Sequence, residues 1–535
     1  MITQLFSSQS KTITGAAIIL GAASFLSRII GVLRDRILAH YFGAGDILDA
    51  YYAAFRIPDF VFNLLIAGAL SAGFIPVFLE IWQKDKDRAW KLTNNILTIV
   101  SLGFLCVCAV LYALTPILMG KMVNNFPPEK LELTIRLTRI MFLSPVLLGL
   151  SSVISSVLHS FKNFIVFALS PILYNLGIIL GVLFFVPRLG PAGLAWGVVL
   201  GAILHVSIQI PALFHYGFCL KPIFSLKDPL VRKVGKLIVP RTLGLATQQI
   251  NLLIMTVLAS SLAAGSIAIF NLANNLQFFS VGIIGHSFAI AAFPTLAKLM
   301  AEGQRDEMIS QLSFSLRQII FFIVPATIIF LLLRAQIVRV VLGSGKFDWN
   351  STIATADTLA FFSLSLFAQC LILILARAFY ALQDTWTPFL LSAAGVILNF
   401  MLSLSLRDHF GVAGLALAFS ISGAIQLALT WIALRFKLKT LHERSMLKSL
   451  LKISLAAFMM ATMVQYMKTP LAALVDMTRF WGIFIQGAVS ALIGLFTYIL
   501  ICHWLKLEEL ELIKKSLRKR WLKLAGTDTS LEQTK

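Results

Sequence analysis

The chain has 535 residues, of which 58% are hydrophobic and only 13% are charged, and its mean hydropathy is +0.87. A soluble protein of this length could not bury that much apolar surface, which excludes a soluble globular fold. The net charge of +21 therefore indicates membrane topology and membrane-surface binding rather than nucleic-acid binding. Apolar stretches of about 20 residues, enough to cross a bilayer core of roughly 30 Å, recur along the chain. We predict an all-α polytopic membrane protein.

Fourteen transmembrane helices are predicted, separated by turn residues such as "FGAGD" at 42–46 and "PRLGP" at 187–191. The first apolar stretch is too long for a cleavable signal peptide, so we expect it to stay as a span. Several spans exceed 25 residues and are expected to tilt. The predicted ranges are 14–42, 48–81, 91–119, 131–160, 164–187, 191–217, 230–263, 267–299, 311–343, 354–381, 386–407, 411–436, 447–467 and 478–504.

Lysine and arginine gather in alternate loops, which predicts the orientation of the chain. The loops near 84–91, 221–236, 298–305 and 435–444 are rich in these residues, and the loops on the opposite side are poor in them. With an even number of spans, both termini are expected in the cytoplasm of a bacterial cell, with the chain in its inner membrane. The tail, 506–535, contains the basic amphipathic stretch "KLEELELIKKSLRKRWLKL", which suits an anionic lipid surface.

A weak internal repeat has an offset near 220 residues. The segment "AFRIPDFVFNLLIAGALSAGFIPVF" at 54–78 lines up with "LANNLQFFSVGIIGHSFAIAAFPTL" at 272–296. Two later segment pairs match in the same order, which predicts two pseudo-symmetric six-helix lobes, 1–217 and 218–440, related by an axis along the membrane normal. Two extra helices, within 441–505, lie outside the repeat.

The first span carries a polar face. Ser27, Arg28, Arg34 and Asp35 share it with Ser24 and Gly31, because their spacing follows one side of an α-helix. An arginine near the bilayer centre costs from about 3 to more than 10 kcal/mol, so this face must meet protein or water. Arg28 either donates to carbonyls inside the bundle or lines a cationic cavity for an anion, and we favour the cavity.

The second span adds Asp49, Arg56, Asp59 and Asn63 close to one face, with a bend expected at Pro58. One alternative is structural, in which Asp35 and Asp49 pair with Arg34, Arg36 or Arg56 and hold the first two spans together. The second half of the chain offers mostly uncharged groups. In the seventh and eighth spans these groups are Asn251, Asn274, Asn275, Gln277 and His286, besides Arg241. Arg377 and Asp384, at the end of the tenth span, are expected to form a structural pair.

Catalytic motifs are absent from the sequence, which contains no HExxH, P-loop or GxSxG pattern and no cysteine spacing for a metal. We therefore expect a transporter rather than an enzyme, without a cofactor or a metal. Guanidinium groups bind phosphates through paired, forked hydrogen bonds. The polar faces thus predict a secondary transporter or flippase for an anionic substrate.

The stretch "SFLSRIIGVLRDRILAHYFGAGDILDAYYAAFRIPD", followed by "NLLIAGALSAGFIPVF", resembles the lipid II flippase family (MurJ/MviN) of the multidrug/oligosaccharidyl-lipid/polysaccharide exporter superfamily. "GSGKFD" at 343–348 and "ARAFYALQDTWTP" at 376–388 are similar to other family patterns. The resemblance implies that undecaprenyl-diphosphate-linked peptidoglycan precursor (lipid II) moves from the cytoplasmic to the outer leaflet. It also implies a groove for the lipid tail on the two extra helices.

By the same resemblance, substrate-binding roles fall on Ser27, Arg28, Arg34, Asp35 and Asp49. Family members often have arginines where this chain has Phe62 or Asn63, and Asn274 or Asn275; we expect Arg56 to take over part of the first role. Coupling to the membrane potential or to a monovalent cation is expected, with Asn251, Asn399 and Ser403 as candidate cation ligands. Cell-wall synthesis enzymes are expected as further partners.

Three other functions remain open at this point. An exporter of another polyprenyl-linked glycan would have much the same sequence. A drug–cation antiporter of the same superfamily should have an acidic cavity, whereas this one is predicted to be basic. A membrane scaffold for cell-wall enzymes would not need Arg28.

Overall fold

The structure, a computed structural model, describes residues 13–65 and 69–515 of the chain. Within these ranges the regular elements are helices, and no strand occurs. The second part of the basic stretch predicted for the tail, 516–524, lies outside the described residues, whereas 508–515 are helical. The side chain of Arg241 also lies outside them.

Each predicted span coincides with one helix or with consecutive helices. The first six correspond to α2 (Ile13–Phe42), α3 (Asp46–Leu65) with α4 (Ala69–Trp82), α5 (Lys86–Met122), α6 (Pro128–Met141) with α7 (Leu143–Ser160), α8 (Phe164–Leu180) with η1 (Gly181–Phe185) and α9 (Val186–Leu189), and α10 (Ala192–Ser207) with α11 (Gln209–His215). The next six correspond to α12 (Pro229–Ser260), α13 (Ser266–Ser280) with η2 (Val281–Gly285) and α14 (His286–Ala301), α15 (Arg305–Leu332) with α16 (Arg334–Val341), α17 (Trp349–Ser363) with α18 (Leu366–Ala381), and the two parts of α19 (Trp386–Leu438). The last two are α20 (Glu443–Leu474) and α21 (Phe480–Trp504).

The polytopic all-α fold is thereby confirmed. Among the described residues, nine helices are long and apolar enough to cross a membrane, or ten if the bent pair α17–α18 forms one span. Fourteen crossings therefore stay a prediction. Within α19, Gly411 has φ 58° and ψ −135°, a conformation that glycine adopts readily, and it bends the chain between the two spans predicted there.

The described residues form two compact units. The first contains the chain up to Asn275 together with Val341–Thr355 and Val396–Leu415, and the second contains Leu276–Val340, Ala356–Gly395 and the part that follows Ala416. These boundaries differ from the sequence halves, because α12, most of α13 and parts of α17 and α19 belong to the first unit. The division into lobes 1–217 and 218–440 stays a prediction.

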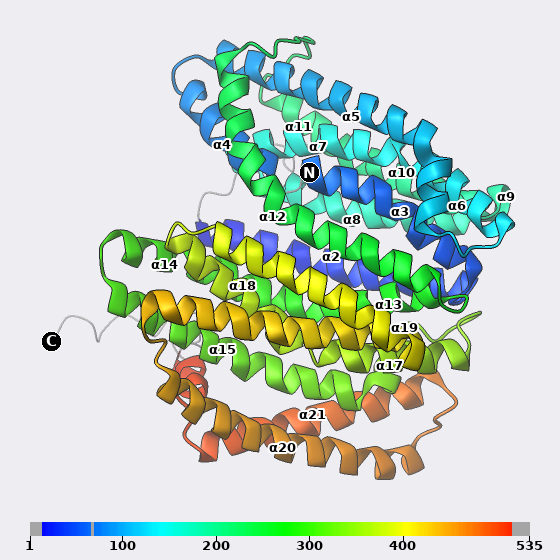
Figure 1. Cartoon of the computed structure of the whole chain (residues 1–535), viewed down its shortest axis with the longest axis vertical. Helices are drawn as coiled ribbons and strands as arrows, with labels where there is room; N and C mark the ends of the chain where they lie inside the picture. The colour runs from blue at the N-terminus through cyan, green and yellow to red at the C-terminus, as the bar shows by residue number, and fades with distance from the viewer. Residues whose placement is uncertain (1–12, 66–68, 516–535) are drawn as a thin grey trace. The chain divides into compact units, whose positions relative to one another are not determined.

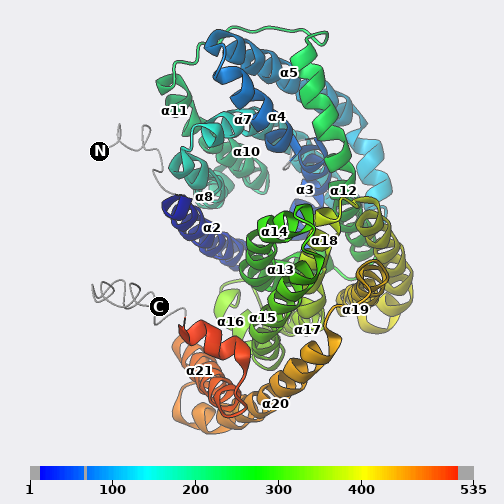
Figure 2. The same ribbon diagram turned by 90° about the vertical axis from the view of Figure 1, so that its left-hand side faces the viewer.

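The first unit has an aromatic core near the ends of α4, α5 and α7. Trp82 lies 5.6 Å from Phe78, 5.2 Å from Trp90 and 4.9 Å from Phe161, measured between ring centroids. Trp82 meets Trp90 and Phe161 edge to face and stacks on Phe78, and such aromatic contacts add to the hydrophobic burial. Elsewhere in this unit α2 packs along α8, and α8 packs along α10 (Figure 1 and Figure 2).

The second unit is built on α14, α15 and α18. The two extra helices, α20 and α21, pack on each other and against α15, and they are drawn in orange and red in Figure 1. The buried Tyr498 on α21 donates to the carbonyl of Phe321 on α15 at 2.8 Å. Arg317 on α15 forms an ion pair with Glu508 at 2.8 Å, which ties the segment after α21 to the same helix.

The expected pair of Arg377 with Asp384 is wrong. Asp384, in the turn after α18, instead binds Lys437 at the end of α19. The guanidinium of Arg377 lies over the ring of Phe293, 5.4 Å from its centroid. The sequence could not reveal this exchange, because Lys437 is 53 residues away from Asp384.

Candidate substrate site

A polar cluster forms around Arg34 in the first unit, where α2 meets α8 and α13. Its Nε and Nη2 atoms donate to Asp35 Oδ1 at 3.0 and 2.7 Å, and Nη1 donates to Asn175 Oδ1 at 2.9 Å. The other carboxylate oxygen, Asp35 Oδ2, accepts from Asn275 Nδ2 at 2.9 Å. Asp35 is 5% exposed, so its charge needs these partners. The cluster brings together three predicted residues, Arg34, Asp35 and Asn275, and adds Asn175.

Arg56 on α3 forms a second cluster with α12 and α13. Its Nε donates to the hydroxyl of Thr256 at 2.8 Å, and its Nη2 donates to the side-chain oxygen of Asn271. Both partners are neutral, and within the described residues no carboxylate lies within 4 Å of this guanidinium. The guanidinium is therefore fixed in place without losing its net charge. Such a group is suited to bind an anion.

Asp49 lies at a structural junction. Its carboxylate accepts from the backbone N–H groups of Gly265 and Ala268 at 2.7 and 2.8 Å, which caps the first turn of α13. It also accepts from Lys130 Nζ on α6 at 2.8 Å. Asp49 is 2% exposed. The expectation that it pairs with an arginine of the first two spans is wrong, because α6 and α13 supply its partners.

The remaining predicted residues lie on α2, α3 and α13. Ser27 and Arg28 are half-buried on α2, one to two turns before Arg34. Asn63 donates to the backbone carbonyl of Asp59 at 2.9 Å, within its own helix, and Asn274 is half-buried beside Asn275 on α13. The pairing of Asp35 with Arg34 is the structural alternative that the sequence left open, although it joins neighbouring residues of one helix rather than two spans.

The three candidate cation ligands also lie together in the first unit. Asn399 Nδ2 donates to Asn251 Oδ1 at 2.8 Å, and Ser403 Oγ lies 3.5 Å from Asn399 Oδ1. No carboxylate belongs to this set, and in the described part of the chain no three His, Cys, Asp or Glu side chains form a metal-binding group. The set offers neutral oxygens only, which suits a monovalent cation better than a divalent one.

Sequence reasoning missed Asn175, Lys130, Thr256 and Asn271 as partners. Asn175 is the one amide side chain in the largely apolar run "SPILYNLGIIL", and this contrast was a usable signal. Thr256 and Asn271 gave no such signal, because 200 and 215 residues separate them from Arg56. Chemically, the two clusters place fixed guanidinium groups on α2 and α3.

Comparison with known proteins identifies relatives over most of the chain. The family model described as "Lipid II flippase MurJ" matches residues 38–484. A probable lipid II flippase MurJ of Buchnera aphidicola subsp. Acyrthosiphon pisum is 32% identical over 430 residues, covering 79% of this chain and 82% of that protein. A probable lipid II flippase MurJ of Haemophilus influenzae is 32% identical over 464 residues, covering 83% and 90%.

Two solved structures share the fold. A lipid II flippase MurJ in an inward closed conformation has a TM-score of 0.75 at 24% identity, covering 90% of this chain and 98% of the other. A multidrug resistance MATE family transporter of the MOP superfamily, in an inward-facing conformation, has a TM-score of 0.66 at 14% identity, covering 78% and 96%. At these identities both matches support the transporter fold alone.

Proposed function

Because this chain belongs to the MurJ family of lipid II flippases, we propose that it moves lipid II from the cytoplasmic to the outer leaflet of the membrane. The observation that carries the proposal is the family match over residues 38–484, which includes α3, Arg56, the whole of α20 and the first five residues of α21. The protein is a multi-pass membrane transporter rather than an enzyme. We place it in a bacterial inner membrane with both termini in the cytoplasm.

The guanidinium groups of Arg28, Arg34 and Arg56 bind the diphosphate in this proposal. Arg56 supports it most directly, because its present partners, Thr256 and Asn271, are neutral and leave a positive charge for the substrate. To bind the diphosphate, the Nη1 atom of Arg34 would have to give up its hydrogen bond to Asn175 and donate to a phosphate oxygen. Its Nε and Nη2 atoms would keep donating to Asp35. The neutral Asn274 and Asn275 contribute hydrogen bonds in place of charge.

The transport cycle is alternating access, in which the headgroup crosses through the protein and the polyprenyl tail stays in lipid along α20 and α21. The membrane potential supplies driving force, because moving a charge through it is worth about 2.3 kcal/mol per 100 mV. A monovalent cation at Asn251, Asn399 and Ser403 is a second source of coupling. Cell-wall synthesis enzymes are the partners that would supply or consume the lipid.

Rescue of a flippase-depleted bacterium tests this function. Wild type is expected to restore growth, whereas Arg28→Ala, made at an equal level in the membrane, is expected to fail. Equal growth with wild type and with Arg28→Ala would support a scaffold function instead. A flipping assay with purified protein in liposomes then separates a lipid II flippase from an exporter of another polyprenyl-linked glycan. The assay compares the two lipids, and faster flipping of the other glycan lipid would overturn the proposal.

A further inference from the structure

One carboxylate of the first unit has no role in the clusters around Arg34, Arg56 and Asp49. Asp59 lies on α3, inside the segment predicted to span the membrane, one turn after Arg56. Within the described residues its carboxylate has no hydrogen bond and no ion pair within 4 Å. A half-buried carboxylate inside a helical bundle needs a partner or a neutralising proton, because desolvation of the charge is costly.

The cations nearest to Asp59 already donate hydrogen bonds to other groups. Arg56 donates to Thr256 and Asn271, and Arg34 donates to Asp35 and Asn175. The charged or titratable groups near enough for their charge to act on Asp59 are Arg34 on α2, Arg56 and Tyr51 on α3, and Tyr174 on α8.

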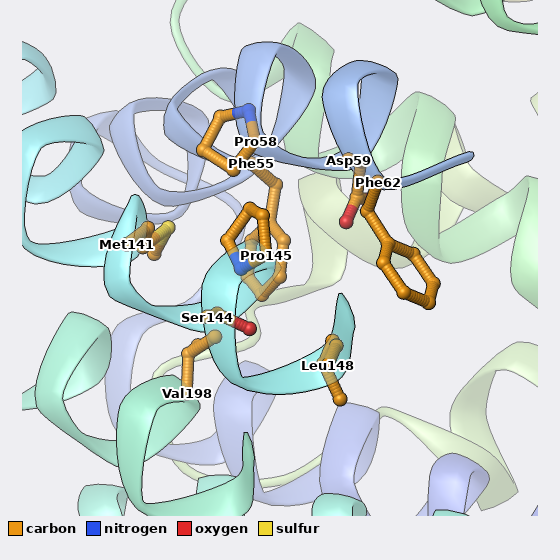
Figure 3. Close-up of a pocket in the computed structure, with 9 residues that line it drawn as sticks. All are labelled: Phe55, Pro58, Asp59, Phe62, Met141, Ser144, Pro145, Leu148 and Val198. Carbon is orange, nitrogen blue, oxygen red and sulfur yellow. The ribbon is translucent and has the colours of Figure 1, made fainter. Parts of the chain in front are cut away.

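Asp59 faces a small pocket between α3 and α7. Figure 3 shows its carboxylate pointing toward the space beside Ser144. The pocket has a volume of about 10 Å³, which is room for roughly one water molecule. The other groups around it are apolar; they are Phe55, Pro58, Phe62, Met141, Pro145, Leu148 and Val198.

The size and lining of this pocket decide between a proton and a divalent metal cation. Ca²⁺ and Mg²⁺ take about six or more oxygen ligands, whereas the lining side chains supply oxygens from Asp59 and Ser144 only. A proton needs one carboxylate oxygen and a water molecule that delivers it. The dimensions of the pocket fit that requirement.

We propose that Asp59 is a proton-binding site of this transporter, loaded and unloaded through the water-sized pocket between α3 and α7. The proton forms an O–H bond with a carboxylate oxygen, is delivered by water and returns to water, so no redox partner is needed. This proposal rests on the transport function proposed above, and it names the proton as one coupling ion.

The position of Asp59 also connects the proton to the substrate site. Residues three apart on a helix are neighbours, so an ionised Asp59 can attract the guanidinium of Arg56. Protonation removes that attraction and leaves Arg56 with Thr256 and Asn271. Pro58 removes the backbone hydrogen bond that residue 58 would donate to the carbonyl of Ala54, which permits α3 to bend between the two side chains.

Difference infrared spectroscopy tests the site without requiring transport. Wild type, Asp59→Asn and the control Asp87→Asn, an exposed carboxylate in the first turn of α5, are placed in lipid nanodiscs and titrated from about pH 5 to about pH 9. We expect a carboxylic acid C=O band in wild type and Asp87→Asn that is lost in Asp59→Asn. Identical spectra for wild type and Asp59→Asn across this range would overturn the proposal.

Flipping in liposomes then tests the coupling. The flipping rate of wild type is expected to depend on pH, and this dependence is expected to be lost in Asp59→Asn. An unchanged pH dependence in Asp59→Asn would refute coupling through this carboxylate. If wild type shows the infrared band but flips no lipid II, the proposed function fails and the proton site stands. If wild type flips lipid II but shows no carboxylic acid band, the proton site is refuted and the proposed function is not.

Discussion

At the level of single residues, Arg56 is the clearest test of the diphosphate site. Arg56→Ala removes a charged donor whose hydrogen bonds are worth about 1.5–3 kcal/mol, so lipid II flipping should fall roughly ten- to a hundredfold. Arg56→Lys keeps the charge but loses the forked geometry, so its flipping rate should lie between those of wild type and Arg56→Ala. The measurement is the flipping rate of purified protein in liposomes.

The matched control for this variant is Arg136→Ala. Arg136 is exposed on α6 and has no ion pair or hydrogen bond within the described residues. The flipping rate of Arg136→Ala is expected to equal that of wild type. Equal losses in both variants would mean that the overall positive charge matters and that Arg56 has no special role.

A second residue-level prediction concerns Asp384 and pH. Burial opposes ionisation of this carboxyl, but hydrogen bonds from Lys437 and Thr387 outweigh it and lower its pKa to about 2. The unfolded pKa is about 3.9. The carboxylate therefore stabilises the fold above about pH 4, and this contribution is lost as the pH falls toward about 2. Wild type should melt at a higher temperature than Asp384→Asn at neutral pH, with the difference shrinking below about pH 4; a constant difference would contradict the assignment.

Residue-level patterns predicted the candidate site only in part. Helical spacing was enough to place Arg34 and Asp35 on one face, and the structure brings them to within 2.7 Å of each other. The partners of Asp49 could not be predicted, because Lys130 is 81 residues away and the N–H groups of α13 carry no side-chain signal. A single sequence indicates which side chains need partners but not which distant ones they meet.

At the level of helices, glycines set the distance between α10 and the helix that α8 and η1 form together. A methyl group on Gly181 would meet the Cα atom of Gly197 at 2.2 Å, so Gly181→Ala should force the helices apart. Overpacking of this kind typically costs about 1–3 kcal/mol. Gly103→Ala on α5 is the control, because nothing lies within 4 Å of the added methyl group. Melting in detergent should be lower for Gly181→Ala alone; equal melting temperatures would refute the close contact.

The segment between α11 and α12 is attached to α5 by two consecutive asparagines. Asn94 donates to the carbonyl of Cys219 and accepts from the N–H of Lys221, both at 2.9 Å. Asn95 makes the equivalent pair with Ser225 at 2.9 and 2.8 Å. The double variant Asn94→Ala/Asn95→Ala removes all four of these hydrogen bonds to the segment, each worth about 1 kcal/mol. Faster hydrogen exchange at 219–225 is expected, and unchanged exchange would show that other contacts hold this segment.

Helix positions were predicted well because apolar length is a strong signal in membrane proteins. Interruptions within a span were harder to predict. Phe142 separates α6 from α7 inside the range 131–160, where Pro145 gave a hint, and η1 and η2 have no distinct sequence pattern. Local breaks depend on packing and on proline, which a hydropathy pattern does not register.

At the level of the whole molecule, the sequence repeat and the compact units describe different relations. The repeat is a similarity between sequence segments, and it predicts halves of nearly equal length. The compact units follow from packing, and Lys346, for example, donates its N–H to the carbonyl of His40 at 2.9 Å. This contact assigns the stretch after α16 to the first unit, although it lies far along in the second half of the sequence.

The orientation of the whole chain gives the last prediction. Cys219 lies in an exposed loop with Lys221 and Lys227, whereas Arg188 is exposed at the other end of the span formed by α10 and α11. The positive-inside rule places Cys219 in the cytoplasm. In a background where the other four cysteines are replaced by serine, an impermeant maleimide added to intact spheroplasts should label Arg188→Cys strongly. It should label Cys219 only after the membrane is permeabilised, and the opposite pattern would invert the topology and move both termini outside.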